Sequence, residues 1–338
     1  MNKEPCKARL GKNLRFFRSR KDKYMININD HKKATIVKKS RKIIYRLFFT
    51  MLFCGIGYIL IYPLIYIFTT SVKSVGDMLD TTTIWVAKNP TFSNYKDVWG
   101  YIEYPSSLIN TLTIAASVTI LNMFVCSAIG YSFARFKFRE RGIIFALVIF
   151  TIIIPPQLIN LPQYLFFLNF DIMGIFKALL GGTLNFNNSI APIVLPAIFG
   201  QGLKTGLFIY IFRQFYRGMP IELEEAGYLD GCGAIRTYLR IMAPNAAPAF
   251  ITVGLLSFVW HWNEVFNQSQ FLNESPTLSM RLVGITGLIT KSSQVTDLSY
   301  VTPTKYAGVA LVILPLLIIY LIGQRFFVQS VERSGIVG

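Results

Sequence analysis

Three glutamates, Glu222, Glu224 and Glu225, lie in one short polar stretch between two long apolar segments of the chain. Pro220 just before them suits the first turn of a helix, where its missing N–H costs nothing. Acidic side chains in a first turn favour the positive end of the helix dipole. Residue types and spacing therefore predict a short, acidic amphipathic helix, which fits either a lever that projects into the cytoplasm or an ordinary cytoplasmic loop that packs against lipid headgroups.

A bend and a second helix are expected after this acidic helix. Gly231 and Gly233 permit backbone angles that other residues resist, so the chain can turn there. Asp230 is of a residue type favoured for capping the helix that follows. Pro244 then marks the return into an apolar segment. Residues 218–244 are thus predicted to form a lever of two short helices.

Residues for catalysis are almost absent from the rest of the chain. It has only two histidines, His31 and His261, and neither has a triad or metal partner nearby in sequence. It also lacks the phosphate-binding pattern GxxxxGK[ST], the zinc pattern HExxH and the nucleophile pattern GxSxG. The four cysteines are scattered, without a CxxC pair. We therefore expect neither an enzyme nor a metal site, and any energy for work must enter from another subunit.

The composition predicts a membrane protein. Of 338 residues, 53% are hydrophobic and 15% charged, against about 25% charged in soluble proteins. Six windows offer the roughly 20 apolar residues that a spanning helix needs, so we predict an all-α polytopic fold with six transmembrane helices. A break at the glycine-rich residues 200–206 must face protein or water, because backbone exposed to lipid cannot stay unpaired. The predicted spans are 47–70, 108–134, 143–162, 190–212, 246–266 and 306–328.

Positive charge is concentrated in the N-terminal arm, residues 1–46, which holds sixteen of the thirty-four Lys and Arg. If both termini lie in the cytoplasm, twenty-six Lys and Arg fall in cytoplasmic segments and seven fall outside. The positive-inside rule favours this orientation. Arg15-Phe16-Phe17-Arg18 interleaves aromatics with cations, as single-strand binders do. Juxtamembrane basic clusters are nevertheless expected from orientation and anionic lipid alone. We therefore expect membrane lipid, and no nucleic acid, as the partner of the arm.

The lever resembles the Glu-Ala-Ala loop of ABC importer permeases, which runs Glu-Ala-Ala, three residues, Gly, nine residues, Ile-x-Leu-Pro. Glu225-Ala226-Gly227, Gly231, Ile241 and Pro244 fall in this register, with Gly227 for the second alanine and Ala243 for the leucine. Further short segments, in order along the chain, resemble the carbohydrate (maltose/multiple-sugar) branch of the binding-protein-dependent transport family. These segments are Tyr62-Pro63, Asn110-Thr111-Leu112, Tyr131 to Phe138, Ile154 to Gln157, Trp262-Asn263-Glu264 and Gln324 to Val328.

This resemblance implies a multi-pass permease subunit of the bacterial cell membrane, which imports a sugar or oligosaccharide with energy from ATP. Its implied partners are a second permease subunit in a heterodimer, two ATPase subunits and an external substrate-binding protein. ATP and Mg²⁺ then belong to the ATPase subunits, and this chain binds no cofactor. The residues implied in ATPase coupling are Glu222, Glu225, Ala226, Gly227, Asp230, Gly231, Ile241 and Pro244.

Candidates for a substrate pathway are fewer. Lys204 is an ionisable residue inside a predicted span, which makes it a functional candidate, although a broken span would let it reach water or a neighbouring subunit. Asn263, Glu264 and Asn267, at the end of the fifth span, suit sugar hydroxyls, a binding protein or a plain helix end. The competing function is an ion-coupled secondary carrier, which needs carboxylates within its spans. The predicted spans hold almost none apart from Glu264.

Overall fold

The computed structural model describes residues 41–334, so most of the predicted basic arm, up to residue 40, lies outside the described residues. Contacts divide the chain into two units, Met1–Tyr66 and Ile67–Gly338. The described part of the first unit belongs to the N-terminal helix Arg41–Ser71, which is long and apolar enough to cross a membrane. Among the described residues there is no β-strand, only one isolated bridge between Phe170 and Leu184. The predicted all-α class is confirmed for these residues.

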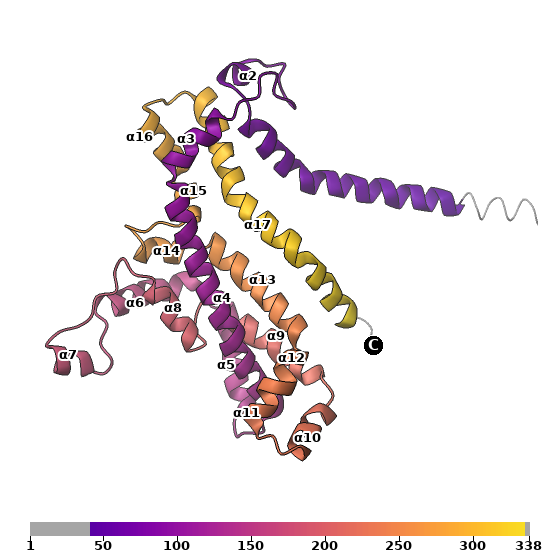
Figure 1. Ribbon diagram of the computed structural model, residues 1–338, viewed down its shortest axis with the longest axis vertical. Helices are drawn as coiled ribbons and strands as arrows, with labels where there is room; N and C mark the ends of the chain where they lie inside the picture. The colour runs from indigo at the N-terminus through magenta and orange to yellow at the C-terminus, as the bar shows by residue number, and fades with distance from the viewer. Residues whose placement is uncertain (1–40, 335–338) are drawn as a thin grey trace, which may run out of the picture. The chain divides into compact units, whose positions relative to one another are not determined.

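The second unit is a succession of helices (Figure 1). They are α2 Val75–Leu79, α3 Ser93–Tyr101, α4 Tyr104–Arg135, α5 Arg141–Ile153, α6 Pro156–Leu168, α7 Ile175–Leu180, α8 Ala191–Ile198, α9 Thr205–Gly218, α10 Glu222–Leu229, α11 Ala234–Thr237, the π-helix η1 Tyr238–Met242, α12 Ala243–Asn245, α13 Ala247–Asn263, α14 Phe266–Phe271, α15 Leu278–Val283, α16 Ile285–Ser293 and α17 Leu298–Ser334.

Three continuous helices in the described part of the chain are long and apolar enough to span a membrane: Arg41–Ser71, Tyr104–Arg135 and Leu298–Gln324. Two further pairs reach that length only across a bend. They are α5 with α6, bent by 97°, and the run Ala234–Asn245 with α13, bent by 76°. Counting each bent pair as one span gives up to five. The predicted number of six spans is therefore not confirmed.

Of the predicted spans 143–162, 190–212 and 246–266, the first two are not continuous helices. The first is broken after Ile153, because Pro155 lacks an N–H and disfavours helical geometry in the residue before it. The second is broken where the glycines predicted a break: α8 ends at Ile198 and α9 begins at Thr205. The third corresponds to the single helix α13, and the bend at Ala246 lies at its start.

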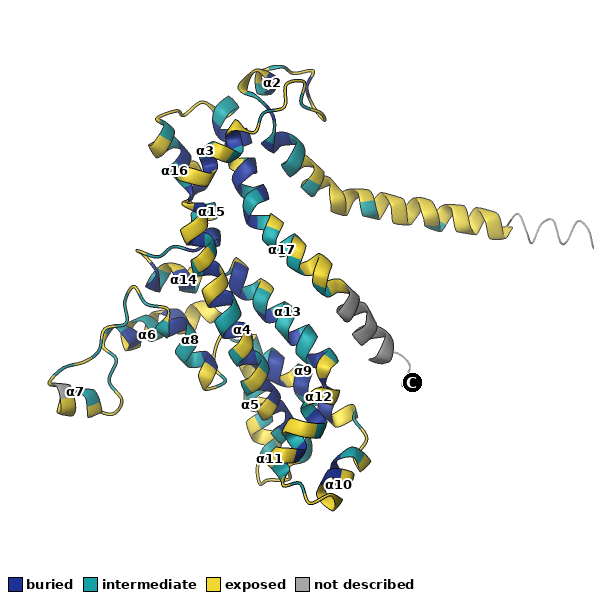
Figure 2. Cartoon of the chain, viewed as in Figure 1, coloured by how far each residue is buried: buried dark blue, intermediate teal, exposed yellow. Residues whose placement is uncertain are grey.

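Helix α4 is the central element of this unit, and both α9 and α13 pack along it. Its buried residues recur at three- and four-residue spacing, as in Ser107, Thr111 and Ile114, and Figure 2 shows buried and exposed residues alternating along α4. One face of the helix therefore turns to its neighbours. At Gly130 the backbones approach closely. A Cβ there would lie 2.6 Å from the Cβ of Phe212 and 2.9 Å from the backbone nitrogen of Arg213. Small residues permit this approach between membrane helices.

Buried hydrogen bonds join α4 to the same neighbours. The Asn122 side-chain amide donates to Ser257 Oγ of α13 at 3.0 Å. The hydroxyls of Ser127 and Tyr216 of α9 lie 2.7 Å apart, and Tyr238 of η1 donates to Ser127 Oγ at 2.9 Å. Because buried polar groups need partners, these bonds fix which faces of α4 meet α13, α9 and η1.

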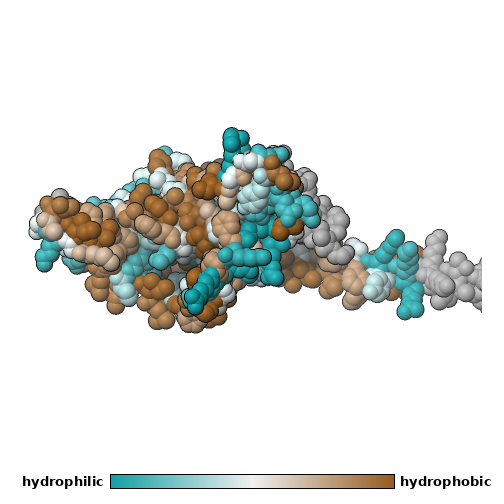
Figure 3. Space-filling model, turned by 90° about the horizontal axis from the view of Figure 1, so that it is seen from below, coloured by the Kyte–Doolittle hydropathy of each residue, from teal (hydrophilic) through white to brown (hydrophobic). Residues whose placement is uncertain are grey.

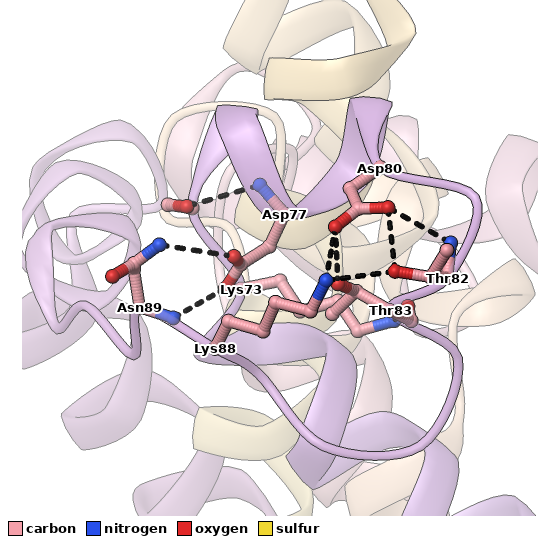
Figure 4. Close-up of polar contacts among 8 residues, drawn as sticks. Lys73, Asp77, Asp80, Thr82, Thr83, Lys88 and Asn89 are labelled. Carbon is pink, nitrogen blue, oxygen red and sulfur yellow. Dashed lines mark hydrogen bonds and ion pairs between the residues drawn. The ribbon is translucent and has the colours of Figure 1, made fainter.

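The segment between Ser71 and α3 is held by side-chain contacts (Figure 4). The buried Lys73 ammonium donates to the carbonyl oxygens of Thr83, at 2.8 Å, and Ile84, at 3.0 Å. Asp80 and Lys88 form an ion pair across the same loop. The hydrogen bond from Lys88, followed by those from the backbone and side chain of Thr82, lowers the pKa of the Asp80 carboxyl. The loop therefore has a defined conformation despite containing only the short helix α2.

The close approach of α4 and α9 yields a stability prediction. We expect Gly130→Ala to reduce stability by about 1–3 kcal/mol, because the added methyl group meets the α9 backbone, which cannot move alone. Gly287→Ala is the matched control, since nothing lies within 4 Å of a Cβ there. Thermal unfolding of both variants in detergent measures the difference. Equal midpoints for the two variants would contradict this packing.

Candidate coupling site

The acidic stretch of the sequence forms α10, whose first turn contains Glu222, Glu224 and Glu225. Its N-cap is Ile221, without a side-chain cap, and the three acidic residues of the first turn favour the positive end of the helix dipole. In Figure 1, α10 and α11 lie next to each other at the end of α4 that contains Arg135. The predicted lever thus has a structural counterpart in the hairpin formed by α10 with α11 and η1.

The bend of the hairpin depends on Gly231, whose φ of 75° is in the left-handed region. Its N–H donates to the carbonyl of Tyr228 at 3.0 Å, and that of Cys232 donates to the carbonyl of Gly227 at 2.9 Å. This is the Schellman pattern that ends a helix. Asp230 is the C-cap of α10. The prediction that it caps the second helix is wrong, because α11 starts only after Gly233.

Gly227 and Ile241, predicted from the motif, meet inside the hairpin. A Cβ on Gly227 would lie 2.7 Å from Ile241 Cδ1 and 3.1 Å from Thr237 Cγ2. The missing side chain therefore allows α10 to lie directly on α11 and η1. Pro244 follows in α12 and is exposed. An alanine at position 227, where the motif has its second alanine, would place its Cβ against Ile241, and glycine avoids this clash.

The lever is attached to α4 through Glu224, which is only 7% exposed. Its Oε1 accepts hydrogen bonds from the hydroxyl of Tyr131, at 2.8 Å, and of Tyr228, at 3.1 Å. Its Oε2 lies 3.5 Å from Arg135 Nε. Burial and the hydrogen bond to Glu224 raise the pKa of the Tyr228 phenol. A carboxylate with this little exposure needs such partners, because desolvation of an unpaired charge is costly.

Arg135 also connects α4 to the start of the lever. Its Nη2 donates to the carbonyl oxygen of Met219 at 2.7 Å, just before α10. The ring of Tyr131 packs against Tyr216 of α9 and Tyr238 of η1, with centroids 5.4 and 5.0 Å apart. The end of α4 therefore contacts α9 and Met219, which lead into the hairpin, and η1, which leads out of it.

The opposite face of the hairpin is open. Glu222, Glu225, Ala226 and Asp230 are exposed, and so are large apolar side chains such as Leu229, at 88%, and Ile235, at 77%. Figure 3, seen from below, shows hydrophobic areas beside hydrophilic ones on this side of the molecule. Acidic and apolar groups together suit a docking surface for another protein. A shallow depression beside it is lined by Gly233, Ala234, Ile235, Arg236, Leu239 and Arg240.

Lys204 lies in the break between α8 and α9. It is the N-cap of α9, with φ of 61°, and is half-buried. Its ammonium is 5.9 Å from the centroid of the Trp260 ring of α13, within cation–π range. The span thus breaks at this residue, and the lysine rests against α13 at the break.

The polar residues at the end of α13 mostly bond to nearby backbone. Glu264 accepts hydrogen bonds from the backbone N–H groups of Asn267, at 2.9 Å, and Gln268, at 3.0 Å, at the start of α14. The exposed Asn263 donates to the carbonyl of Val259 at 2.9 Å. The Asn267 Oδ1 atom is buried without a hydrogen-bond partner. Glu264 therefore serves as a helix cap.

The sequence did not predict that Glu224, Tyr131 and Arg135 hold the lever, and it indicated for Glu224 only a place in the acidic first turn. One signal was available, since Glu224 and Gly227 are three residues apart and share a helix face. A glycine allows close packing on its face of a helix. Gly227 therefore indicates that Glu224, on the same face, is the glutamate that becomes buried. Its partners lie far along the chain on α4; Tyr131, for example, is 93 residues away. No local pattern predicts such partners.

Residues 126–333, more than half of the chain, match the family of the binding-protein-dependent transport system inner membrane component. The chain belongs to this family. The matched region includes both the lever and the end of α4 that holds it. The resemblance predicted from the short motifs is confirmed, and the family is one of transport components rather than enzymes.

Similar proteins are known from several bacteria. A putative ABC transporter permease, ORF2, of Caldicellulosiruptor sp. (strain Rt8B.4) is 28% identical over 82% of this chain and 91% of its own length. The arabinooligosaccharides transport system permease protein AraQ of Bacillus subtilis is 26% identical over 87% and 97%. The diacetylchitobiose uptake system permease protein NgcG of Streptomyces coelicolor is 25% identical over 82% and 84%.

A solved structure has the same fold. It is the crystal structure of a bacterial ABC transporter involved in the import of the acidic polysaccharide alginate. The TM-score is 0.65 at 20% identity, covering 84% of this chain and 96% of that one. The fold of this membrane component is therefore shared over nearly the whole of that chain.

The attachment of the lever can be tested by removing its buried charge. We expect Glu224→Ala to lower the free energy of unfolding by about 3 kcal/mol, because Arg135 then stays buried without a carboxylate. Glu222→Ala, on the exposed side of the same turn, should change it by less than about 0.5 kcal/mol. Thermal unfolding of the detergent-solubilised variants distinguishes them, and equal effects would show that Glu224 does not hold α10.

Proposed function

We propose that this chain is the permease subunit of an ATP-driven ABC importer that moves a sugar or oligosaccharide across the bacterial cell membrane. The observation that carries this proposal is the family match over residues 126–333, which includes the lever. Relatives named for the transport of arabinooligosaccharides and of diacetylchitobiose support the substrate class. In this proposal the bent pairs and the broken segment α8–α9 complete six crossings, with the lever and both termini in the cytoplasm.

The proposed assembly contains a second permease subunit, two ATPase subunits and an external substrate-binding protein. ATP and Mg²⁺ are bound by the ATPase subunits, and this chain supplies the surface that receives their movement. Its open face, with Glu222, Glu225 and Leu229, suits a groove on an ATPase subunit that accepts an amphipathic helix.

Movement of the docked helix reaches the membrane through two sets of contacts. Glu224 links α10 to Tyr131 and Arg135 of α4. Gly227 lies against Ile241 of η1, which continues through α12 to α13. We infer that α4 and α13 move together with the lever, because its direct contacts with α4 and with η1 couple their positions.

The substrate pathway is proposed to pass the break at Lys204 and the end of α13. Lys204 lies against Trp260, and Asn263 is exposed one helical turn further on. The Asn267 oxygen has an unused acceptor position. These groups suit hydroxyl-rich substrates, whereas Glu264 contributes by fixing the start of α14.

Purification in mild detergent tests the function directly. An affinity-tagged full chain, expressed in its own host, should carry with it a second permease and a nucleotide-binding subunit. In proteoliposomes, sugar uptake should then require ATP on the side of the membrane where the ATPase subunits lie. This uptake should persist after the ion gradients are collapsed. Recovery of the chain alone, with uptake abolished by an ionophore, would instead support an ion-coupled carrier.

Coupling through the bend gives a second test. Gly231→Val should reduce the sugar transported per ATP hydrolysed by about tenfold, the equivalent of about 1.4 kcal/mol, while the subunits still assemble. The reason is that a β-branched residue resists the φ of 75° at this position. Gly233→Val is the control, since Gly233 has φ of −73°. An unchanged transport ratio in Gly231→Val would count against the lever as the coupling element.

A further inference from the structure

Three arginines gather where α5 and α9 pack against each other. The guanidinium carbon of Arg213 lies 3.8 Å from the centroid of the Phe145 ring. Arg141 is one turn from Phe145 on α5, and Arg217 is one turn from Arg213 on α9. The three ion pairs among the described side chains of residues 41–324 all lie elsewhere. We refer to Arg141, Arg213 and Arg217 as the arginine cluster.

Among the described side chains no carboxylate forms an ion pair with the cluster, and Arg141 Nη1 donates to the backbone carbonyl of Phe136 at 3.0 Å. Arg213 is half-buried, and its Nε atom is buried without a hydrogen-bond partner. Burial, together with the positive charges of Arg217 and Arg141, lowers the pKa of Arg213, which follows the predicted fourth span. The neighbouring Glu140 is exposed and forms none of the ion pairs in the described chain. An anion bound here relieves this repulsion.

The surroundings of the cluster are apolar and accessible. None of the residues of α5 is buried. Exposed aliphatic side chains begin within one turn of Arg141, at Ile143 and Ile144, and continue to Ile153 at the far end of the helix. The ring of Tyr210 stacks on that of Phe145 with centroids 6.4 Å apart. The cations therefore lie at the level where an exposed apolar surface begins.

This arrangement matches an amphipathic anion. A phosphodiester offers the oxygen geometry that the planar guanidinium fork binds best. Acyl chains attached to it would run along exposed aliphatic side chains such as those of α5, and basic pockets between membrane helices bind anionic headgroups in this way. An inorganic anion uses the arginines but gains nothing from the apolar surface.

We propose that the arginine cluster binds the phosphate of an anionic glycerophospholipid at the membrane surface. The cation–π contact with Phe145 holds Arg213 in place, and the exposed Arg217 adds a second donor from the same helix face. The proposal needs only that the chain lies in a bilayer. It therefore stands or falls independently of the transported substrate and of the ATPase.

The test uses the full chain, purified with whatever subunits accompany it, and native mass spectrometry with phosphatidylglycerol or phosphatidylcholine. The wild type should retain phosphatidylglycerol in preference. Arg213→Gln and Arg217→Gln should each weaken this retention about fivefold, as expected for one juxtamembrane charge. Arg139→Gln is the matched control, because Arg139 is exposed and lies in the turn before α5, outside the cluster. Arg217 is itself exposed, so Arg217→Gln decides the matter if Arg213→Gln fails to fold.

Several results would overturn the proposal. Equal retention of the two lipids by the wild type would remove the preference for negative charge. Unchanged retention in Arg217→Gln would place the lipid elsewhere. Displacement of phosphatidylglycerol by excess inorganic phosphate would identify the ligand as a free anion. Loss of an accompanying protein subunit from Arg217→Gln, with lipid retention unchanged, would assign the cluster to a protein partner.

Discussion

The burial of one carboxylate, that of Glu224, is the constraint on which the arrangement of the lever depends. Helix α10 has eight residues, too few to be stable in isolation. Its position is therefore set by its contacts. A charge with this little exposure persists only where hydrogen bonds and an opposite charge accompany it, and Tyr131 and Arg135 provide both from the end of α4.

The same end of α4 belongs to a core whose packing is defined by small and polar residues. In lipid there is little hydrophobic gain from bringing two apolar helices together, so close backbone approach and hydrogen bonds select the partners. Gly130 allows α9 to approach α4 closely, and the bond from Asn122 to Ser257 fixes α13. The lever thus contacts a helix that is itself held firmly against the elements on both sides.

Sequence reasoning was accurate where a local property decides the outcome. Glycines 200–206 indicated the break before α9, and Gly231 indicated the bend that ends α10. Direction was not predicted: counting apolar residues gave a span at 143–162 but not the 97° bend between α5 and α6 within it. Asp230 was expected to cap the next helix, but that helix begins three residues too late for the cap.

The sequence by itself determined the apolar character of the chain, the positions of its acidic helix and glycine bend, and its family. These follow from residue types and spacings within a few turns. Only the tertiary structure decided which of the three glutamates in the first turn of α10 is buried, and which arginines of the described chain lie together outside any ion pair. The physical reason is that burial and charge pairing depend on neighbours brought from far along the chain, as with Tyr131 and Glu224, 93 residues apart.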